Sequence, residues 1–131
     1  MKRVGIVGTG VMGRTVAGRL VEAGIPVRGY DAFAGCAAAA AQAGVAMSDT
    51  VAELGRHCDW VILFLPGPAE IAECVAGPAG LLTTLGAGSV IVDMCTSAPE
   101  NTVAMAAAAG KAGIGYVDAP VLGRPSTVGK W

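Results

Sequence analysis

The sequence has few charged residues and only one histidine, and these shortages exclude two classes of site. Among 131 residues there are 9 lysines and arginines and 10 aspartates and glutamates, so the net charge is −1. No basic run indicates a nucleic-acid-binding face. The four cysteines, Cys36, Cys58, Cys74 and Cys95, are widely spaced and form no C-x-x-C pair. With a single histidine we expect no metal site, and we expect free thiols, as in a reducing compartment.

Long apolar runs are also missing, although 53% of the residues are hydrophobic. No run approaches the roughly 18 apolar residues that a membrane helix needs. The start, Met1-Lys2-Arg3, is similar to that of a signal peptide, but glycines interrupt the apolar residues that follow and Arg14 ends them. We therefore expect a cytoplasmic protein without membrane contact, and 131 residues suffice for one packed core.

Glycine is abundant, and one glycine-rich stretch organises the chain: Gly8-Thr9-Gly10-Val11-Met12-Gly13. Its G-x-G-x-x-G spacing follows a short apolar run and opens an amphipathic one, which is the strand-turn-helix context of a dinucleotide site. Gly8 would allow the tight turn, Gly10 would let a pyrophosphate approach the backbone, and Gly13 would let the helix pack close to the strand. We expect these six residues to bind the cofactor, and a purely structural turn is the alternative.

The position of one acidic residue supports the nucleotide interpretation. Asp31 lies 18 residues after Gly13, near the spacing of about 20 at which a carboxylate binds the adenosine ribose hydroxyls. The same charge would repel a 2′-phosphate, so we expect NAD to be preferred over NADP. A turn aspartate without a ligand is the alternative.

Alternating elements predict the fold. Short apolar strands alternate with helices, and glycines such as Gly24, Gly44 and Gly110 are expected to end the helices. We expect the α/β class, with a Rossmann-type doubly wound parallel sheet in three layers and about six strands in the order 3-2-1-4-5-6. The expected strands are 2–7, 26–30, 45–47, 60–65, 89–92 and 114–117.

Two helix starts are also predicted. Ser48 or Asp49 is expected to cap a helix that runs to about Arg56. The Ser-x-x-Glu spacing from Ser97 to Glu100 predicts a capping box that opens a helix to about Ala109.

Ligands of such a sheet bind at the carboxyl ends of its strands. This rule excludes His57 and Lys111, which fall at the opposite edge, from a catalytic role. Lys130 belongs to a tail without a fixed position. We expect residues 1–118 to form the dinucleotide-binding domain and residues 119–131, which show no periodicity, to begin a further segment.

These segments together resemble the β-hydroxyacid dehydrogenase family, which includes 3-hydroxyisobutyrate dehydrogenase, tartronate semialdehyde reductase and, more distantly, 6-phosphogluconate dehydrogenase. The resemblance spans nearly the whole chain. It rests on the glycine stretch, Tyr30-Asp31, Leu65-Pro66, Asp93-Met94-Cys95-Thr96 with Pro99, and Asp118-Ala119-Pro120-Val121. It implies that Leu65, Pro66 and Thr96 contact the cofactor near its nicotinamide, and that the parent enzyme reversibly oxidises a small 3-hydroxyacid by hydride transfer.

The resemblance also implies a substrate site, in which this chain departs from the family. Cys95 stands where the family usually has serine, and Leu122-Gly123-Arg124 stands where it usually has Ser-Gly-Gly. We expect these four residues to line the site of a small acidic substrate. Arg124 could replace the lost groups, because a guanidinium suits a carboxylate. A solvated loop arginine is the alternative.

The resemblance further implies that the general acid/base lysine and the main oligomer contacts lie in an all-helical second domain, which these 131 residues do not include. We therefore expect no catalytic residue in this chain. It should bind NAD with little or no turnover, and the parent enzyme should be a homo-oligomer.

Two alternatives stay open. One is an NADPH-dependent, imine reductase-like relative, which a titration comparing NADH with NADPH would distinguish. The other is a stand-alone nucleotide-sensing module, which would not need the 93–96 and 118–120 segments.

Overall fold

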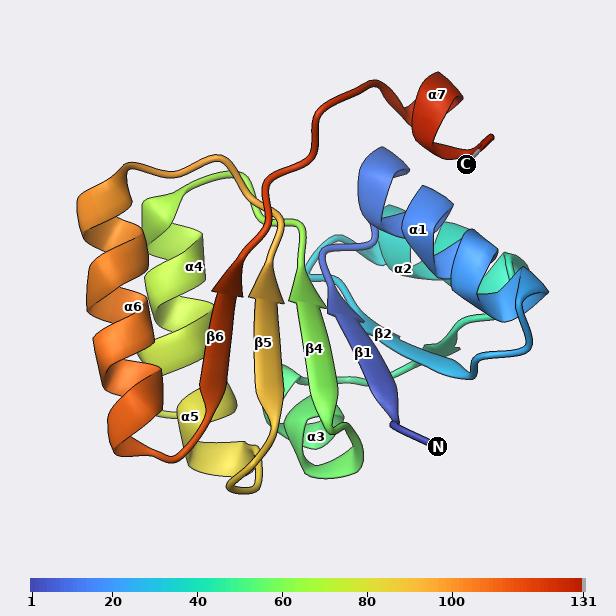
Figure 1. The fold of residues 1–131 in the computed structure, drawn as a ribbon. Coiled ribbons are helices and arrows are strands. Elements are labelled where there is room, and N and C mark those ends of the chain that lie inside the picture. The colour runs from blue at the N-terminus through green and yellow to red at the C-terminus, as the bar shows by residue number, and fades with distance from the viewer. Residues whose placement is uncertain (131) are drawn as a thin grey trace.

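The computed structural model describes residues 1–130 and contains one parallel sheet with helices on both faces (Figure 1). Its strand order, β3-β2-β1-β4-β5-β6, confirms the predicted 3-2-1-4-5-6. The strands are β1 (Val4–Val7), β2 (Val27–Tyr30), β3 (Ala46–Met47), β4 (Trp60–Leu63), β5 (Val90–Asp93) and β6 (Gly115–Asp118). The helices are α1 (Val11–Glu22), α2 (Ala34–Gln42), α3 (Val51–His57), α4 (Pro68–Ala76), α5 (Leu81–Thr84), α6 (Pro99–Lys111) and α7 (Pro125–Val128).

Two cores form because the strands are apolar on both faces. On one face, α1 and α2 bury Ala17 and Ala40 against Ile6 of β1. On the other, the helices α3 to α6 pack on Val61, Leu63 and Ile91 of the central strands. Small helix residues allow this close packing, and the result is the three-layer arrangement expected of a doubly wound sheet.

The register brings the carboxyl ends of five strands together. The terminal residues pair laterally in the order Tyr30, Val7, Leu63, Asp93, Asp118. The connections that follow these strands therefore begin at one edge of the sheet, where an open α/β fold binds its ligands.

Two predicted helix caps are wrong. α3 is capped by Thr50, whose hydroxyl accepts a hydrogen bond from the Glu53 amide at 3.0 Å, and not by Ser48 or Asp49. α6 has Ala98 as its N-cap and no side-chain cap, and the buried Ser97 hydroxyl has no hydrogen-bond partner among the described residues. Pro99 explains the difference: its fixed φ favours the first helical position, which leaves Ser97 outside the helix.

The structure also differs from prediction in the ends of several elements and in one added helix. β4 ends at Leu63, not at Leu65. α6 continues past Gly110 and ends before Gly113, whose φ of 70° provides the left-handed turn. The segment after β6 contains the short helix α7, which contacts α1 through residues such as Gly129 beside Thr15. Among residues 1–130, no helix is long and apolar enough to cross a membrane.

Candidate functional site: a nucleotide-sized cavity at the carboxyl edge

The glycine turn between β1 and α1 is shaped by backbone contacts at two of its glycines. Gly8 has a φ of 91°, and its amide donates to the Tyr30 carbonyl at 2.9 Å. A Cβ on Gly8 would collide with the Phe64 carbonyl oxygen, and a Cβ on Gly13 would collide with the Gly8 carbonyl oxygen. Gly8 therefore permits both the turn and the approach to β4, and Gly13 permits close packing of α1, as the sequence predicted.

Gly10 differs from both, because a Cβ placed there would meet nothing within 4 Å. Its φ of −61° suits any residue, so neither folding nor packing requires glycine at this position. Gly10 is the N-cap of the 12-residue helix α1, which has no side-chain cap and no acidic residue in its first turn. The open space thus lies where helix amides and the helix dipole attract an anion, which fits the pyrophosphate of a dinucleotide.

Asp31 is fixed against this turn. Its Oδ2 accepts hydrogen bonds from the Thr9 amide at 2.7 Å and from the Thr9 hydroxyl at 3.3 Å. Its Oδ1 accepts one from the Phe33 amide at 2.9 Å. Thr9 is fully buried, so its side chain holds Asp31 in place and does not face the cavity described next.

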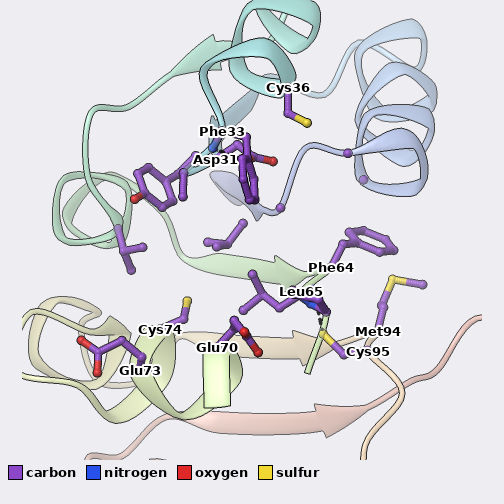
Figure 2. A pocket seen from close by; sticks show the side chains of 18 of the residues that line it. Asp31, Phe33, Cys36, Phe64, Leu65, Glu70, Glu73, Cys74, Met94 and Cys95 are labelled. Atoms are coloured by element: carbon purple, nitrogen blue, oxygen red, sulfur yellow. Dashed lines mark hydrogen bonds between the residues drawn. The ribbon is translucent and has the colours of Figure 1, made fainter. Parts of the chain in front are cut away.

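A cavity of about 1190 Å³ opens over the glycine turn and extends to both sides of it (Figure 2). It is large enough for a dinucleotide by the usual size of ligand sites. Of the residues predicted from the sequence, the cavity is lined by Gly8, Gly10, Val11, Met12, Gly13, Asp31, Leu65, Pro66, Cys95 and Thr96.

The predicted substrate segment is placed differently. Val121 lines the cavity, but Leu122, Gly123 and Arg124 do not. Leu122 is 92% exposed, and Arg124 is an exposed residue at the N-cap of α7. Of the four predicted substrate residues, the cavity therefore includes Cys95 alone.

Several residues that line the cavity were not predicted. In Figure 2, Phe33 and Cys36 lie on the same side as Asp31, and Glu70, Glu73 and Cys74 lie opposite them. Phe33 had a signal in the sequence, since an aromatic residue follows the strand-terminal aspartate. Glu70 and Glu73 had a weaker one, because α4 begins only a few residues after β4 ends at the ligand-binding edge.

The charge of the cavity is negative. Its lining includes three carboxylates, Asp31, Glu70 and Glu73. None of the described residues that line it is lysine, arginine or histidine. The wall near Asp31 thus has no side chain that could neutralise an additional phosphate.

The thiols and the histidine lack the features of catalytic groups. Burial raises the pKa of Cys95 and of Cys74 to about 12, so both thiols stay protonated near neutral pH. His57 lies at the end of α3, where its Nδ1 is 2.8 Å from the Glu53 carbonyl oxygen, and it does not line the cavity. No group of metal-ligating side chains occurs among residues 1–130.

Comparison with protein families gives one match over nearly the whole chain. The model of the NAD binding domain of 6-phosphogluconate dehydrogenase matches residues 3–128. Among curated proteins, 2-(hydroxymethyl)glutarate dehydrogenase of Eubacterium barkeri is 34% identical over 121 residues, which are 92% of this chain and 40% of that protein. The chain thus spans about two fifths of the length of this relative.

Solved structures agree in fold. The 3-hydroxyisobutyrate dehydrogenase of Mycobacterium tuberculosis, solved with L-serine, superposes with a TM-score of 0.91 at 29% identity, covering 96% of this chain and 42% of that one. Psf3, solved with NADP+ and 2-OPP, superposes with a TM-score of 0.88 at 27% identity, covering 94% and 44%.

Proposed function

Because the chain belongs to the family of the NAD binding domain of 6-phosphogluconate dehydrogenase, we propose that it is the cofactor-binding domain of an NAD-dependent 3-hydroxyacid dehydrogenase. One observation carries the proposal: the space beside Gly10, at the N-terminus of α1, is part of a cavity that reaches Asp31 on one side and Thr96 on the other. Such a cavity suits a ligand with two nucleosides joined by a pyrophosphate.

Each part of the cavity then has a role. The first amides of α1 would hold the pyrophosphate, and Asp31 would accept a hydrogen bond from the adenosine ribose. Leu65, Pro66 and Thr96 would lie at the nicotinamide end. The bound cofactor would exchange a hydride with the carbon that carries the substrate hydroxyl.

Two features support NAD over NADP. A carboxylate has about four lone-pair sites, and Asp31 uses three with Thr9 and Phe33, so one on Oδ1 stays available for a ribose hydroxyl. In addition, Glu70 and Glu73 make the cavity more negative, and its described lining offers no cation for a 2′-phosphate. The relative solved with NADP+ indicates that family membership alone does not set this preference.

For the parent enzyme, we propose a small acidic 3-hydroxyacid as substrate. Two of the relatives are named for substrates of this class: a 3-hydroxyisobutyrate dehydrogenase and a 2-(hydroxymethyl)glutarate dehydrogenase. Val121 lines the cavity and would border the substrate, whereas the exposed Arg124 lies outside the cavity, which favours a solvated loop arginine over a carboxylate clamp. Hydride transfer from an alcohol needs a proton acceptor. The described lining offers no lysine or histidine, and the family resemblance places the acid/base lysine in a second domain outside these 131 residues. The chain alone would therefore bind cofactor with little or no turnover.

Calorimetric titration of the chain with NADH and with NADPH tests the proposal. We expect NADH to bind at least about tenfold more tightly, the effect of one charge-assisted hydrogen bond. Equal affinities would contradict the NAD preference, and no binding of either would contradict the cofactor-domain assignment. Steady oxidation of 3-hydroxyisobutyrate by the 131-residue chain would contradict the absence of a catalytic base.

A further inference from the structure

A network of hydrogen bonds connects residues at the carboxyl ends of β6, β5 and β4, next to the cavity. The Tyr116 hydroxyl, on β6, donates to Asp93 Oδ2 at 2.6 Å. Asp93 Oδ1 accepts from the Cys95 amide at 3.0 Å, and Cys95 Sγ accepts from the Leu65 amide at 3.1 Å. Side chains from β6 and β5 are thus connected to the residues that follow β5 and β4.

The two ends of this chain of bonds face different environments. Cys95 and Leu65 line the large cavity, whereas Tyr116 and Asp93 do not. Asp93 is 1% exposed, so its carboxylate depends on the Tyr116 hydroxyl and the Cys95 amide for hydrogen bonds. Burial and the hydrogen bond to Asp93 raise the pKa of Tyr116, which keeps its hydroxyl a donor.

The bond from the Cys95 amide to Asp93 turns the backbone sharply after β5. An aspartate that accepts from the amide two residues later forms an Asx turn, which sets the direction of the chain. This turn immediately precedes Thr96, which is exposed in the cavity. The same network explains why β4 does not reach Leu65. The Phe64 amide still bonds to the Val7 carbonyl of β1, but the Leu65 amide bonds to the Cys95 sulfur and not to a neighbouring strand.

We propose that Tyr116 and Asp93 are positioning residues for the nicotinamide end of the cofactor site, because they fix Leu65 and Thr96 through Cys95. The inference rests on the proposed function, since that function assigns Leu65 and Thr96 to the nicotinamide. Neither Tyr116 nor Asp93 touches the ligand. Their loss would loosen one end of the cavity and leave the glycine turn and Asp31 unchanged.

The test compares two ligands in the variant Tyr116→Phe. NADH reaches both ends of the site, whereas ADP-ribose lacks the nicotinamide. Residues that couple to a site without contacting its ligand typically change affinity by about twofold to thirtyfold. We therefore expect the ratio of NADH affinity to ADP-ribose affinity to fall by about twofold to thirtyfold, with a smaller change in the fluorescence of NADH on binding.

The variant Val117→Ala is the matched control, because Val117 is the next residue of β6 and is 46% exposed; the ratio should not change. If Tyr116→Phe does not fold, the same affinity ratio is measured in Asp93→Asn, which keeps the shape of the side chain, and this ratio tests the inference. An unchanged ratio, or an equal loss of affinity for both ligands, would overturn this inference but leave the proposed function intact. A wild-type chain that binds neither ligand overturns the proposed function and the inference with it.

Discussion

The Asp31 carboxylate, directly after β2, accepts a 2.7 Å hydrogen bond from the backbone amide of Thr9, inside the glycine turn after β1. The residue proposed for the ribose therefore also supports the turn proposed for the pyrophosphate. Thr9 is fully buried with Asp31 in place, so its amide depends on this carboxylate for its hydrogen bond. Ligand affinity and fold stability are consequently coupled at this one side chain.

The variant Asp31→Ser should show both effects. We expect NAD affinity to fall by about tenfold to a hundredfold, since a charge-assisted hydrogen bond contributes about 1.5–3 kcal/mol. The preference for NADH over NADPH should decrease, because a negative charge has been removed. The free energy of unfolding should fall by about 1–3 kcal/mol, the cost of an unsatisfied buried amide.

Calorimetry and urea unfolding measure these two quantities. Glu100→Gln removes an exposed carboxylate from the first turn of α6 and serves as the control. It should leave the affinities for both cofactors unchanged and lower the free energy of unfolding by less than about 1 kcal/mol, the contribution of the helix dipole. Unaltered dissociation constants for both cofactors in Asp31→Ser would refute its role in the site.

Substitutions of two glycines should separate binding from folding. In Gly10→Ala the new methyl group would occupy open space, so we expect a loss of NAD affinity of about tenfold or more. Stability should fall by less than about 1 kcal/mol, because alanine is a poorer N-cap than glycine. In Gly13→Ala the methyl group would collide with the Gly8 carbonyl, so we expect a loss of stability of about 1–3 kcal/mol.

Gly18→Ala is the matched control for both glycines. Gly18 lies in the interior of α1, and a Cβ there meets nothing within 4 Å. This change should leave NAD affinity unaltered and stabilise the helix by about 0.5–1 kcal/mol. Full affinity for NAD in Gly10→Ala would contradict the assignment of Gly10 to cofactor binding.

The sequence predicted the features that residues close together in the chain determine. It missed the features that arise only when distant segments pack together. The glycine spacing and the apolar strands are local signals, and they were sufficient for the strand order. The contact between Tyr116 and Asp93 arises only when β5 and β6 pair, so no spacing in the sequence indicates it. Likewise, α7 has no periodic pattern, and its Val128 is buried only because the segment returns over α1.

The N-terminus of α3 provides a test between the predicted and the observed cap. Thr50→Ala should lower the free energy of unfolding by about 1 kcal/mol, because the Glu53 amide loses the hydroxyl that accepts its hydrogen bond. Asp49→Ala should change it by less than about 0.5 kcal/mol, since the Asp49 backbone amide, which donates to Glu53 at 2.8 Å, is retained. Urea unfolding of both variants measures the two changes. A larger loss of stability in Asp49→Ala than in Thr50→Ala would favour Asp49 as the cap, as the sequence predicted.

Thiol labelling should distinguish the four free cysteines and locate the cofactor. Cys36, Cys74 and Cys95 all line the cavity, but Cys36 is half-buried, whereas Cys58, Cys74 and Cys95 are buried. Burial raises the pKa of Cys58 to about 11 and that of Cys74 and Cys95 to about 12, so at pH 8 about one buried thiol in a thousand or fewer is the reactive thiolate.

We expect iodoacetamide at pH 8 to modify Cys36 first, with peptide mass spectrometry as the measurement. Saturating NAD should slow this reaction, because Cys36 and Asp31 lie on the same side of the cavity. A Cys36→Ser chain should incorporate almost no label over the same time while it stays folded. Rapid labelling of Cys95 or Cys74 in the folded chain would show that these thiols are accessible and ionised, which would restore Cys95 as a candidate reactive group at the nicotinamide end.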